Sequence, residues 1–306
     1  MALALASFSS NLTSPDELVR DLGHFPSSPV VLPALMAQLS DDTVELSEVV
    51  DLIKLDAGIA ARILQVANSA YYVRSGRCDF IAEAVHRIGF LRTYQLVSFA
   101  SASRLLMEPL TTYGLSAREL WRRSVSAAIA AEILAETCGL NPQLAYTAGL
   151  FHGIGLLAID TWARHREPAP RVRSCGYPME MTGPEAVAFG FDNAAVAASL
   201  LRSWKFPDNI VETIRWQFQP DAADADNQRL ACILSVARWL RDAVAVAPGA
   251  QSLLLPSVWE LSMVGQTADG IIGLIEEIRQ AFADATYRLG DLGLGETALL
   301  RGSSAA

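Results

Sequence analysis

The sequence predicts an all-α protein, and three observations support that prediction. Apolar residues recur at spacings of three and four through nearly every segment, which is the period of an amphipathic helix. No segment of useful length alternates apolar with polar residues, as a half-buried strand does. Residues typical of helix N-termini, such as Ser-Pro-Asp-Glu at 14–17, precede several of the periodic segments.

Helices are expected throughout the first third of the chain. Ser14 begins the first of them, because Ser caps a helix N-terminus and Pro15 suits its first turn. Asp56 is placed to cap a later helix, and Gly89 to end the one after it. Further helices are expected at 45–55, 56–67, 78–88 and 91–106. The turn-rich segment 107–114 marks the first boundary.

The rest of the chain continues in the same manner. A helix capped by Ser116 is followed by one that begins at Asn141–Pro142. Within the latter segment Gly149 and Gly153 lie four residues apart, so we expect a neighbouring helix to approach closely there. Helices around 230–244 and 270–289 follow an irregular stretch at 164–184 and an acidic loop at 220–226. These breaks predict helical parts at 14–112 and 113–220, then a C-terminal helical extension at 221–306 with a disordered tail.

The composition excludes several classes of protein. Hydrophobic residues make up 51% of the 306 residues, which is enough for a sizeable core and excludes a disordered chain. A net charge of −9 gives no overall attraction for nucleic acid or for an anionic membrane. The four cysteines form no CxxC pair, and the most apolar stretch, 145–159, is shorter than the ~20 residues of a membrane span. We therefore expect a soluble, cytoplasmic protein with no nucleic-acid or membrane partner.

Two stretches of the sequence resemble the HDOD family. The first is DAGIAARILQVANSAYY at 56–72 with the following AEAVHRIGFLRTYQLV, and the second is AGLFHGI at 148–154, preceded by LWRRS at 120–124. Members of that family are helical modules of bacteria, distantly related to the HD phosphohydrolases. The resemblance covers roughly residues 25–220. Its structural marks are Asp56, the Asn68-Ser69-Ala70 triplet and an Ala-Val-x-x-Ile-Gly run that ends at Gly89, although Asp56-Ala57 departs from the usual Asp-Pro.

The resemblance implies where the chemistry of an HD phosphohydrolase would lie. Such an enzyme has a His on one helix, a His-Asp pair on the next and a later Asp, which together bind the metals that activate water. Here the corresponding positions carry Arg123-Ser124, His152-Gly153 and Asn193, and Gln217-Phe218 replaces a His-rich run. One imidazole cannot hold a divalent metal, because three or four ligands are needed. We therefore expect no metal, no cofactor and no catalytic residue.

A vestigial pocket is the corresponding site in this chain. The resemblance assigns its lining to Arg123, His152, Asn193, Trp216 and Gln217. Arg123 could pair with Asp192 or bind a phosphate or carboxylate of a ligand, but we favour the interpretation that it extends to solvent from a helix flank. We likewise interpret His152 as a hydrogen-bonded core residue, and Asn68 as a residue that caps or bonds neighbouring backbone.

The resemblance implies a function in bacterial signal transduction. The expected protein is a non-catalytic regulatory module that acts in trans, through contacts with signalling proteins of a two-component or cyclic-dinucleotide pathway or through a small anionic ligand in the pocket. The alternative is a degenerate metal-dependent phosphohydrolase acting on a nucleotide or a cyclic dinucleotide, with metal ligands beyond His152 that the sequence does not identify.

Overall fold

The computed structural model describes residues 14–22, 25, 29, 31–38, 46–69, 71–72, 76–103, 105–106, 108–164, 166, 171–172, 181–245 and 254–291. Within these ranges the chain is built from helices and contains no strand, which confirms the all-α prediction. Leu110 and Leu115 form an isolated antiparallel bridge within the turn-rich segment. The expected tail after 291 and most of the expected irregular stretch at 164–184 lie outside the described residues.

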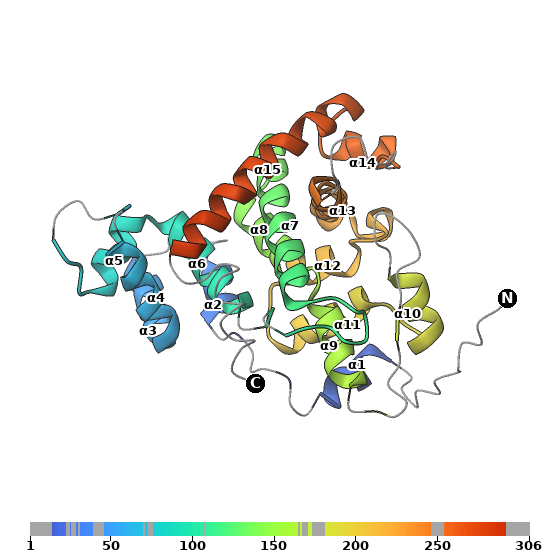
Figure 1. The fold of residues 1–306 in the computed structure, drawn as a ribbon, viewed down its shortest axis with the longest axis horizontal. Coiled ribbons are helices and arrows are strands. Elements are labelled where there is room, and N and C mark those ends of the chain that lie inside the picture. The colour runs from blue at the N-terminus through green and yellow to red at the C-terminus, as the bar shows by residue number, and fades with distance from the viewer. Residues whose placement is uncertain are drawn as a thin grey trace.

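Fifteen α-helices and one short 3-10 helix follow one another in the described part of the chain (Figure 1). The first six are α1 (Pro15–Arg20), α2 (Val31–Gln38), α3 (Leu46–Lys54), α4 (Ala57–Ala67), α5 (Ile81–Ile88) and α6 (Phe90–Ser103). The next six are α7 (Ala117–Cys138), α8 (Pro142–Phe151), α9 (Ile154–Ala163), α10 (Thr182–Phe189), α11 (Asn193–Ser203) and α12 (Asp208–Arg215). The chain ends with η1 (Pro220–Ala222), α13 (Ala225–Ala245), α14 (Val258–Met263) and α15 (Ala268–Asp291).

Three residues of the family resemblance, Asp56, Asn68 and Gly89, lie at the ends of helices α4 and α5. The Asp56 carboxylate accepts from the backbone N–H groups of Gly58 and Ile59 and thereby caps α4. Asn68 follows the last turn of α4, where its amide donates to the carbonyls of Leu64 and Cys78 and its oxygen accepts from the Cys78 N–H. Asn68 therefore ties the end of α4 to the segment that leads into α5. Gly89 ends α5 with a φ of 88°, a conformation that favours glycine.

A hairpin of α7 and α8 lies at the centre of the molecule (Figure 1). A capping box between Ser116 and Glu119 begins α7, and the Asn141 side chain caps α8 ahead of Pro142. The two helices approach so closely at Gly149 that a Cβ there would lie 2.6 Å from the Ala127 carbonyl oxygen. This contact is the one expected of Gly149 from its position.

The second close approach lies at a different glycine from the one expected. A Cβ on Gly153 would meet nothing nearer than a Leu120 methyl group at 3.6 Å, which is an ordinary distance. A Cβ on Gly155 would lie 1.9 Å from the Asn193 carbonyl oxygen, so Gly155 is the residue that lets α9 and α11 touch. The sequence prediction was therefore wrong for Gly153, because the contact depends on which helix lies alongside and not on the spacing alone.

Two apolar cores hold the helices together. The larger core joins buried residues from α1 through α12, includes Leu234 of α13 and Phe282 of α15, and runs across the turn-rich segment at 107–114. The smaller core joins α7 and α8 to α13, α14 and α15 through residues such as Ala131, Leu240 and Ile278. The helices after residue 220 therefore pack directly on the central hairpin.

The stretch Pro142–Ala163 is long and apolar enough, by length and composition, to cross a membrane, and it exceeds the 15 residues identified in the sequence. It consists of α8 and α9, and 83% of its most apolar window is buried inside the fold. That burial is typical of the core helices of a soluble protein.

Candidate functional site

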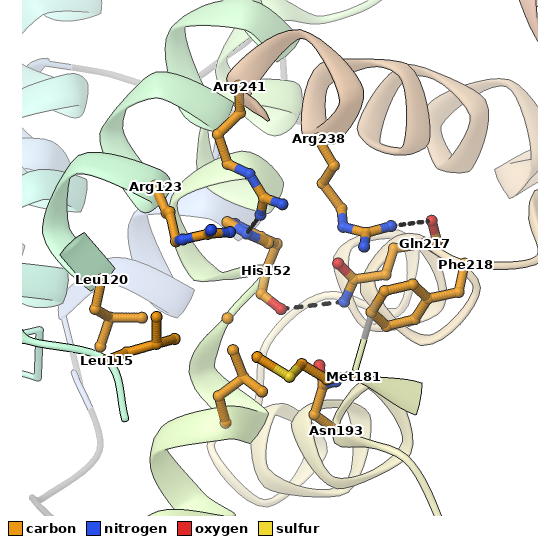
Figure 2. A pocket seen from close by; sticks show the side chains of 12 residues that line it. Leu115, Leu120, Arg123, His152, Met181, Asn193, Gln217, Phe218, Arg238 and Arg241 are labelled. Atoms are coloured by element: carbon orange, nitrogen blue, oxygen red, sulfur yellow. Dashed lines mark hydrogen bonds between the residues drawn. The ribbon is translucent and has the colours of Figure 1, made fainter. Parts of the chain in front are cut away.

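A small cavity lies where several segments of the chain meet beside the central hairpin (Figure 2). α7 contributes Arg123, the α8–α9 junction contributes His152, and α13 contributes Arg238 and Arg241. Its volume is about 30 Å³. The complete lining consists of Leu115, Leu120, Arg123, His152, Gly153, Leu156, Met181, Asn193, Gln217, Phe218, Arg238 and Arg241.

Both ring nitrogens of His152 are engaged in hydrogen bonds. Nδ1 lies 2.6 Å from the Gly149 carbonyl oxygen, so it carries the proton and donates. Nε2 lies 2.7 Å from a terminal nitrogen of Arg241, which always donates, so Nε2 accepts. Burial lowers the pKa of His152 well below its usual range, and the nearby Arg241 and Arg238 lower it further. His152 is therefore neutral and held in one tautomer.

Arg241 joins His152 to a buried acid. Its Nε and its second terminal nitrogen donate to the two carboxylate oxygens of Asp242, at 2.9 and 2.7 Å. The Arg241 and Asp242 side chains are only 6% and 4% exposed, so this bidentate pair is almost wholly removed from water.

The sequence had suggested that Arg123 extends to solvent from a helix flank, but the structure shows it paired with an acidic residue. Its side chain is 23% exposed and donates to the Asp242 carboxylate at 3.3 Å. The alternative partner considered for it, Asp192, instead lies 3.7 Å from Arg215. The acidic partner of Arg123 is therefore Asp242 on α13, a helix that lies beyond the residues that resemble the HDOD family.

Gln217 connects the turn after α12 to the His152 backbone. Its side-chain nitrogen donates to the carbonyls of His152 and Ile214, at 3.0 and 3.1 Å. Arg238 donates to the backbone carbonyl of Gln217 at 3.0 Å, and its guanidinium lies over the Phe218 ring at 3.8 Å from the centroid. The side-chain oxygen of Gln217 is buried and has no hydrogen-bond partner.

Asn193 links the cavity to a second buried polar cluster. Its backbone N–H and its side-chain nitrogen both donate to one oxygen of Glu185, at 2.7 and 2.8 Å. The Tyr113 hydroxyl donates to the other Glu185 oxygen at 2.7 Å. Burial raises the pKa of Glu185 to about 7, an effect that these three donors oppose without cancelling.

The structure brings together four of the five residues assigned to the pocket from the sequence: Arg123, His152, Asn193 and Gln217. Trp216 is not among the lining residues, and its assignment was wrong. Its indole nitrogen donates to Glu212 at 3.1 Å, and Arg215 lies over its ring. Trp216 is the C-cap residue of α12, and its side chain contacts Glu212 and Arg215 instead of lining the cavity.

Sequence reasoning missed Arg238, Arg241 and Phe218. The two arginines lie three residues apart on α13, a spacing that places them on the same helix face, but α13 lies beyond the stretch that carries the resemblance. The structural marks Asp56, Asn68, Ser69 and Gly89 lie in or beside α4 and α5, and none of them lines the cavity.

The residues around the cavity do not fit a divalent metal ion. Both nitrogens of His152 are already bonded, and the nearby Asp242 carboxylate is held by Arg241 and Arg123. Three guanidinium groups would also repel a cation. Within the described ranges, no group of three or more His, Cys, Asp or Glu residues is arranged to hold a metal.

Comparison with known proteins places most of the chain in a family. The model of the HDOD domain matches residues 25–220. An uncharacterized protein of Treponema pallidum (strain Nichols) is 25% identical over 197 residues, which are 62% of this chain and 37% of that protein. The chain thus spans little more than a third of the length of that curated relative.

Solved structures share the fold at low sequence identity. An HDOD domain protein of unknown function from Geobacter sulfurreducens is 21% identical, with a TM-score of 0.63 over 88% of this chain and 97% of its own. A protein of Marinobacter aquaeolei VT8, provisionally named a signal transduction protein, is 21% identical with a TM-score of 0.69 over 93% and 62%. A protein of Shewanella amazonensis SB2B, provisionally named a phosphohydrolase, is 22% identical with a TM-score of 0.57 over 90% and 95%. The family model covers well over half of the sequence, and on that basis the chain belongs to the HDOD domain family.

Proposed function

We propose that this protein is a non-catalytic regulatory module of bacterial, cytoplasmic signal transduction, which acts by binding rather than by hydrolysis. The observation that carries the proposal is the hydrogen bond between Arg241 and His152 Nε2. In an HD phosphohydrolase the corresponding imidazole would bind a metal, whereas here a guanidinium occupies that side of the ring.

The surrounding groups support the same conclusion. A metal-dependent hydrolase needs a cation that polarises the phosphoryl group and lowers the pKa of a bound water. Guanidinium groups can bind an anion, but they supply no such water and keep their protons at physiological pH. The lining residues also offer no carboxylate to serve as a general base.

A binding module acts through the molecules that it recognises. We propose signalling proteins of a two-component or cyclic-dinucleotide pathway as its partners, in line with the family and with the provisional name of the Marinobacter relative. The cavity in its present form is far below the ~300 Å³ of an ordinary small-molecule site, so a whole cyclic dinucleotide does not fit inside it.

Metal content and hydrolytic activity test the proposal together. Protein purified without chelator and without a metal-binding tag is analysed by elemental mass spectrometry, then assayed with a phosphomonoester, a phosphodiester and a cyclic dinucleotide in the presence of Mn²⁺, Fe²⁺ or Mg²⁺. We expect substoichiometric metal and no turnover above that of the same assay mixture without protein.

The outcome that would overturn the proposal is one equivalent or more of bound metal that is lost in His152→Ala, together with turnover that is lost in the same variant. That result would favour the alternative, a degenerate metal-dependent phosphohydrolase. Gly153→Asp provides a sharper control, because a Cβ fits at this position and the variant restores the His-Asp pair. We expect Gly153→Asp to bind no metal, since His152 remains bonded to Arg241.

A further inference from the structure

The cavity beside His152 is suited to negative charge. We infer that it binds one small protonated tetrahedral oxyanion, either inorganic phosphate or the terminal phosphate of a monoester. This inference rests on the proposed function, because a catalytic metal in the same space would require a different set of side chains.

The charges around the cavity are the first reason. Three guanidinium groups line it, from Arg123, Arg238 and Arg241, and none of the twelve lining residues is acidic. Asp242 lies beside the lining and bonds both Arg241 and Arg123, and Glu119 lies within electrostatic range of Arg123, so acidic groups offset part of the positive charge from outside the lining. Each guanidinium group has five N–H donors in one plane, and this arrangement matches the positions of the oxygens of a phosphate.

Arg241 retains donors that its neighbours do not use. Its bonds to Asp242 and His152 take three of the five N–H groups of the guanidinium. The side chain is held from both sides by these bonds and is only 6% exposed, so it is already oriented before a ligand arrives. A preorganised donor of this kind costs little ordering on binding.

The side-chain oxygen of Gln217 is the second reason, and it is independent of charge. Gln217 is wholly buried, and its nitrogen is directed to two backbone carbonyls, so the amide cannot be flipped without losing both bonds. Figure 2 shows the nitrogen toward the His152 carbonyl and the oxygen on the side of Arg238. Gln217 is one of the lining residues of the cavity, and its side-chain oxygen is buried without a hydrogen-bond partner, which costs about 1–3 kcal/mol.

An unpartnered acceptor beside three cations selects the protonation state of the ligand. The oxygen of Gln217 requires an O–H or N–H donor, whereas the arginines require a negatively charged acceptor. A phosphate monoester meets both requirements, because its second pKa of ~6 leaves a fraction protonated near neutral pH, and inorganic phosphate is a weaker acid that keeps a larger fraction protonated. Sulfate and simple carboxylates are fully ionised there and offer no such donor.

The size of the cavity limits the ligand. Its volume of about 30 Å³ is enough for roughly two ordered water molecules or for one tetrahedral oxyanion group. The remainder of a phosphate monoester would have to extend out of the cavity, and Arg238 and Phe218 indicate one direction for it. Those two residues also line a second, larger cavity of about 190 Å³, next to Trp239 and Leu254, which offers space for such an extension.

Calorimetric titration tests the inference with simple probes. Sodium phosphate and sodium sulfate are titrated separately at constant ionic strength, with chloride as the balancing ion. We expect saturable phosphate binding at one site and at least 10-fold weaker sulfate binding. Phosphate binding is expected to weaken by about 10-fold or more in Arg123→Gln and Arg238→Gln, since each loses a charge-assisted bond.

Arg122→Gln is the matched control, because Arg122 neighbours Arg123 on α7 but lies over the Phe282 ring and does not line the cavity. We expect Arg122→Gln to bind phosphate like the wild type. Circular dichroism establishes that each variant is folded at the titration temperature, and Arg123→Lys, which keeps the charge, covers the case in which Arg123→Gln does not fold. Arg123→Lys is expected to bind phosphate between the wild-type and Gln levels.

Equal affinity for phosphate and sulfate would overturn the inference. Equal losses of phosphate affinity in Arg122→Gln and Arg123→Gln would also overturn it. Titration with glycerol phosphate separates the two sources of the oxyanion. Binding at least as tight as that of inorganic phosphate identifies a monoester site, and binding of inorganic phosphate alone identifies a site for the free ion. Hydrolysis of the monoester would contradict the proposed function while leaving the oxyanion site intact, so the two failures are distinguishable.

Discussion

Two buried polar clusters lie side by side in this protein and differ in the sign of their charges. One consists of His152, Arg241 and Asp242 with the arginines around the cavity, and the other consists of Glu185 with Tyr113 and Asn193. Asn193 belongs to both, because it lines the cavity and donates to Glu185. Burial favours the neutral form of the central residue in each cluster, yet the consequences differ.

His152 stays in one protonation state, whereas Glu185 changes its protonation state near neutral pH. The pKa of His152 lies well below its usual range because of burial and the nearby arginines, so the ring stays neutral across the physiological pH range. The pKa of Glu185 is raised to about 7 by burial, so this carboxyl group changes charge close to neutral pH. The comparison teaches that the motif His stays neutral and hydrogen-bonded here, and that a group which titrates near neutral pH lies outside the motif.

The largest expected effect is the loss of Arg241. Arg241→Met leaves Asp242 buried without its bidentate partner and leaves His152 Nε2 without its donor. Breaking a buried ion pair from one side typically costs about 3–5 kcal/mol of unfolding free energy. Urea denaturation measures the change, with Arg229→Met as the control, because Arg229 is on the same helix but exposed. A change below about 1 kcal/mol in Arg241→Met would show that the His152 cluster is not a structural unit.

The contact between α9 and α11 should be nearly as sensitive. Gly155→Ala places a Cβ within 1.9 Å of the Asn193 carbonyl oxygen, which must move and carry the donors to Glu185 with it. We expect a loss of about 3 kcal/mol, since a clash with backbone cannot relax as a side chain does. Gly153→Ala is the matched control, for which the change should stay within about 0.5 kcal/mol. Equal melting temperatures for the two variants would contradict this account of the packing.

The pH dependence of stability isolates the Glu185 cluster. Its folded-state pKa of about 7 lies above the ordinary value of 4.5, so its stabilising contribution is complete below about pH 4.5 and is lost as the pH rises through 7. We expect the stability of the wild type relative to Glu185→Gln to fall by about 1–3 kcal/mol between pH 5 and pH 8.

Comparison with Glu185→Gln is required because Glu132, whose pKa burial also raises to about 7, contributes in the same direction in both proteins. Denaturation curves at several pH values give the difference directly. A difference that does not change with pH would mean that Glu185 keeps one charge state throughout this range.

The smallest effect is expected for a substitution at Trp216, which lies just outside the lining of the cavity. Trp216→Phe removes the part-buried indole bond to Glu212, at a residue outside the lining of the cavity. We expect a loss of about 0.5–1 kcal/mol in stability and no change in phosphate binding. Weaker phosphate binding in Trp216→Phe would extend the site beyond the residues that line it in Figure 2.

Much of the architecture was predictable because its determinants are local. Ser116, Asn141 and Asp56 begin helices through bonds to backbone groups two or three residues away, so the sequence predicts those boundaries directly. The missing ligand positions were also visible, since Gly153 stands next to His152 where an Asp would be required. The division at residue 220 stays a prediction, although α13 contributes to the core of the central hairpin and to the cavity.

The sequence by itself determined that this chain is helical and that it lacks the HD ligand set, because caps, periodicity and adjacent residues act over a few positions. Only the tertiary structure decided what took the place of those ligands. Arg241 lies 89 residues from His152, and Asp242 lies 119 residues from Arg123. Side chains so far apart meet only where the packing of α7, α8 and α13 brings them together, and no local pattern encodes that meeting.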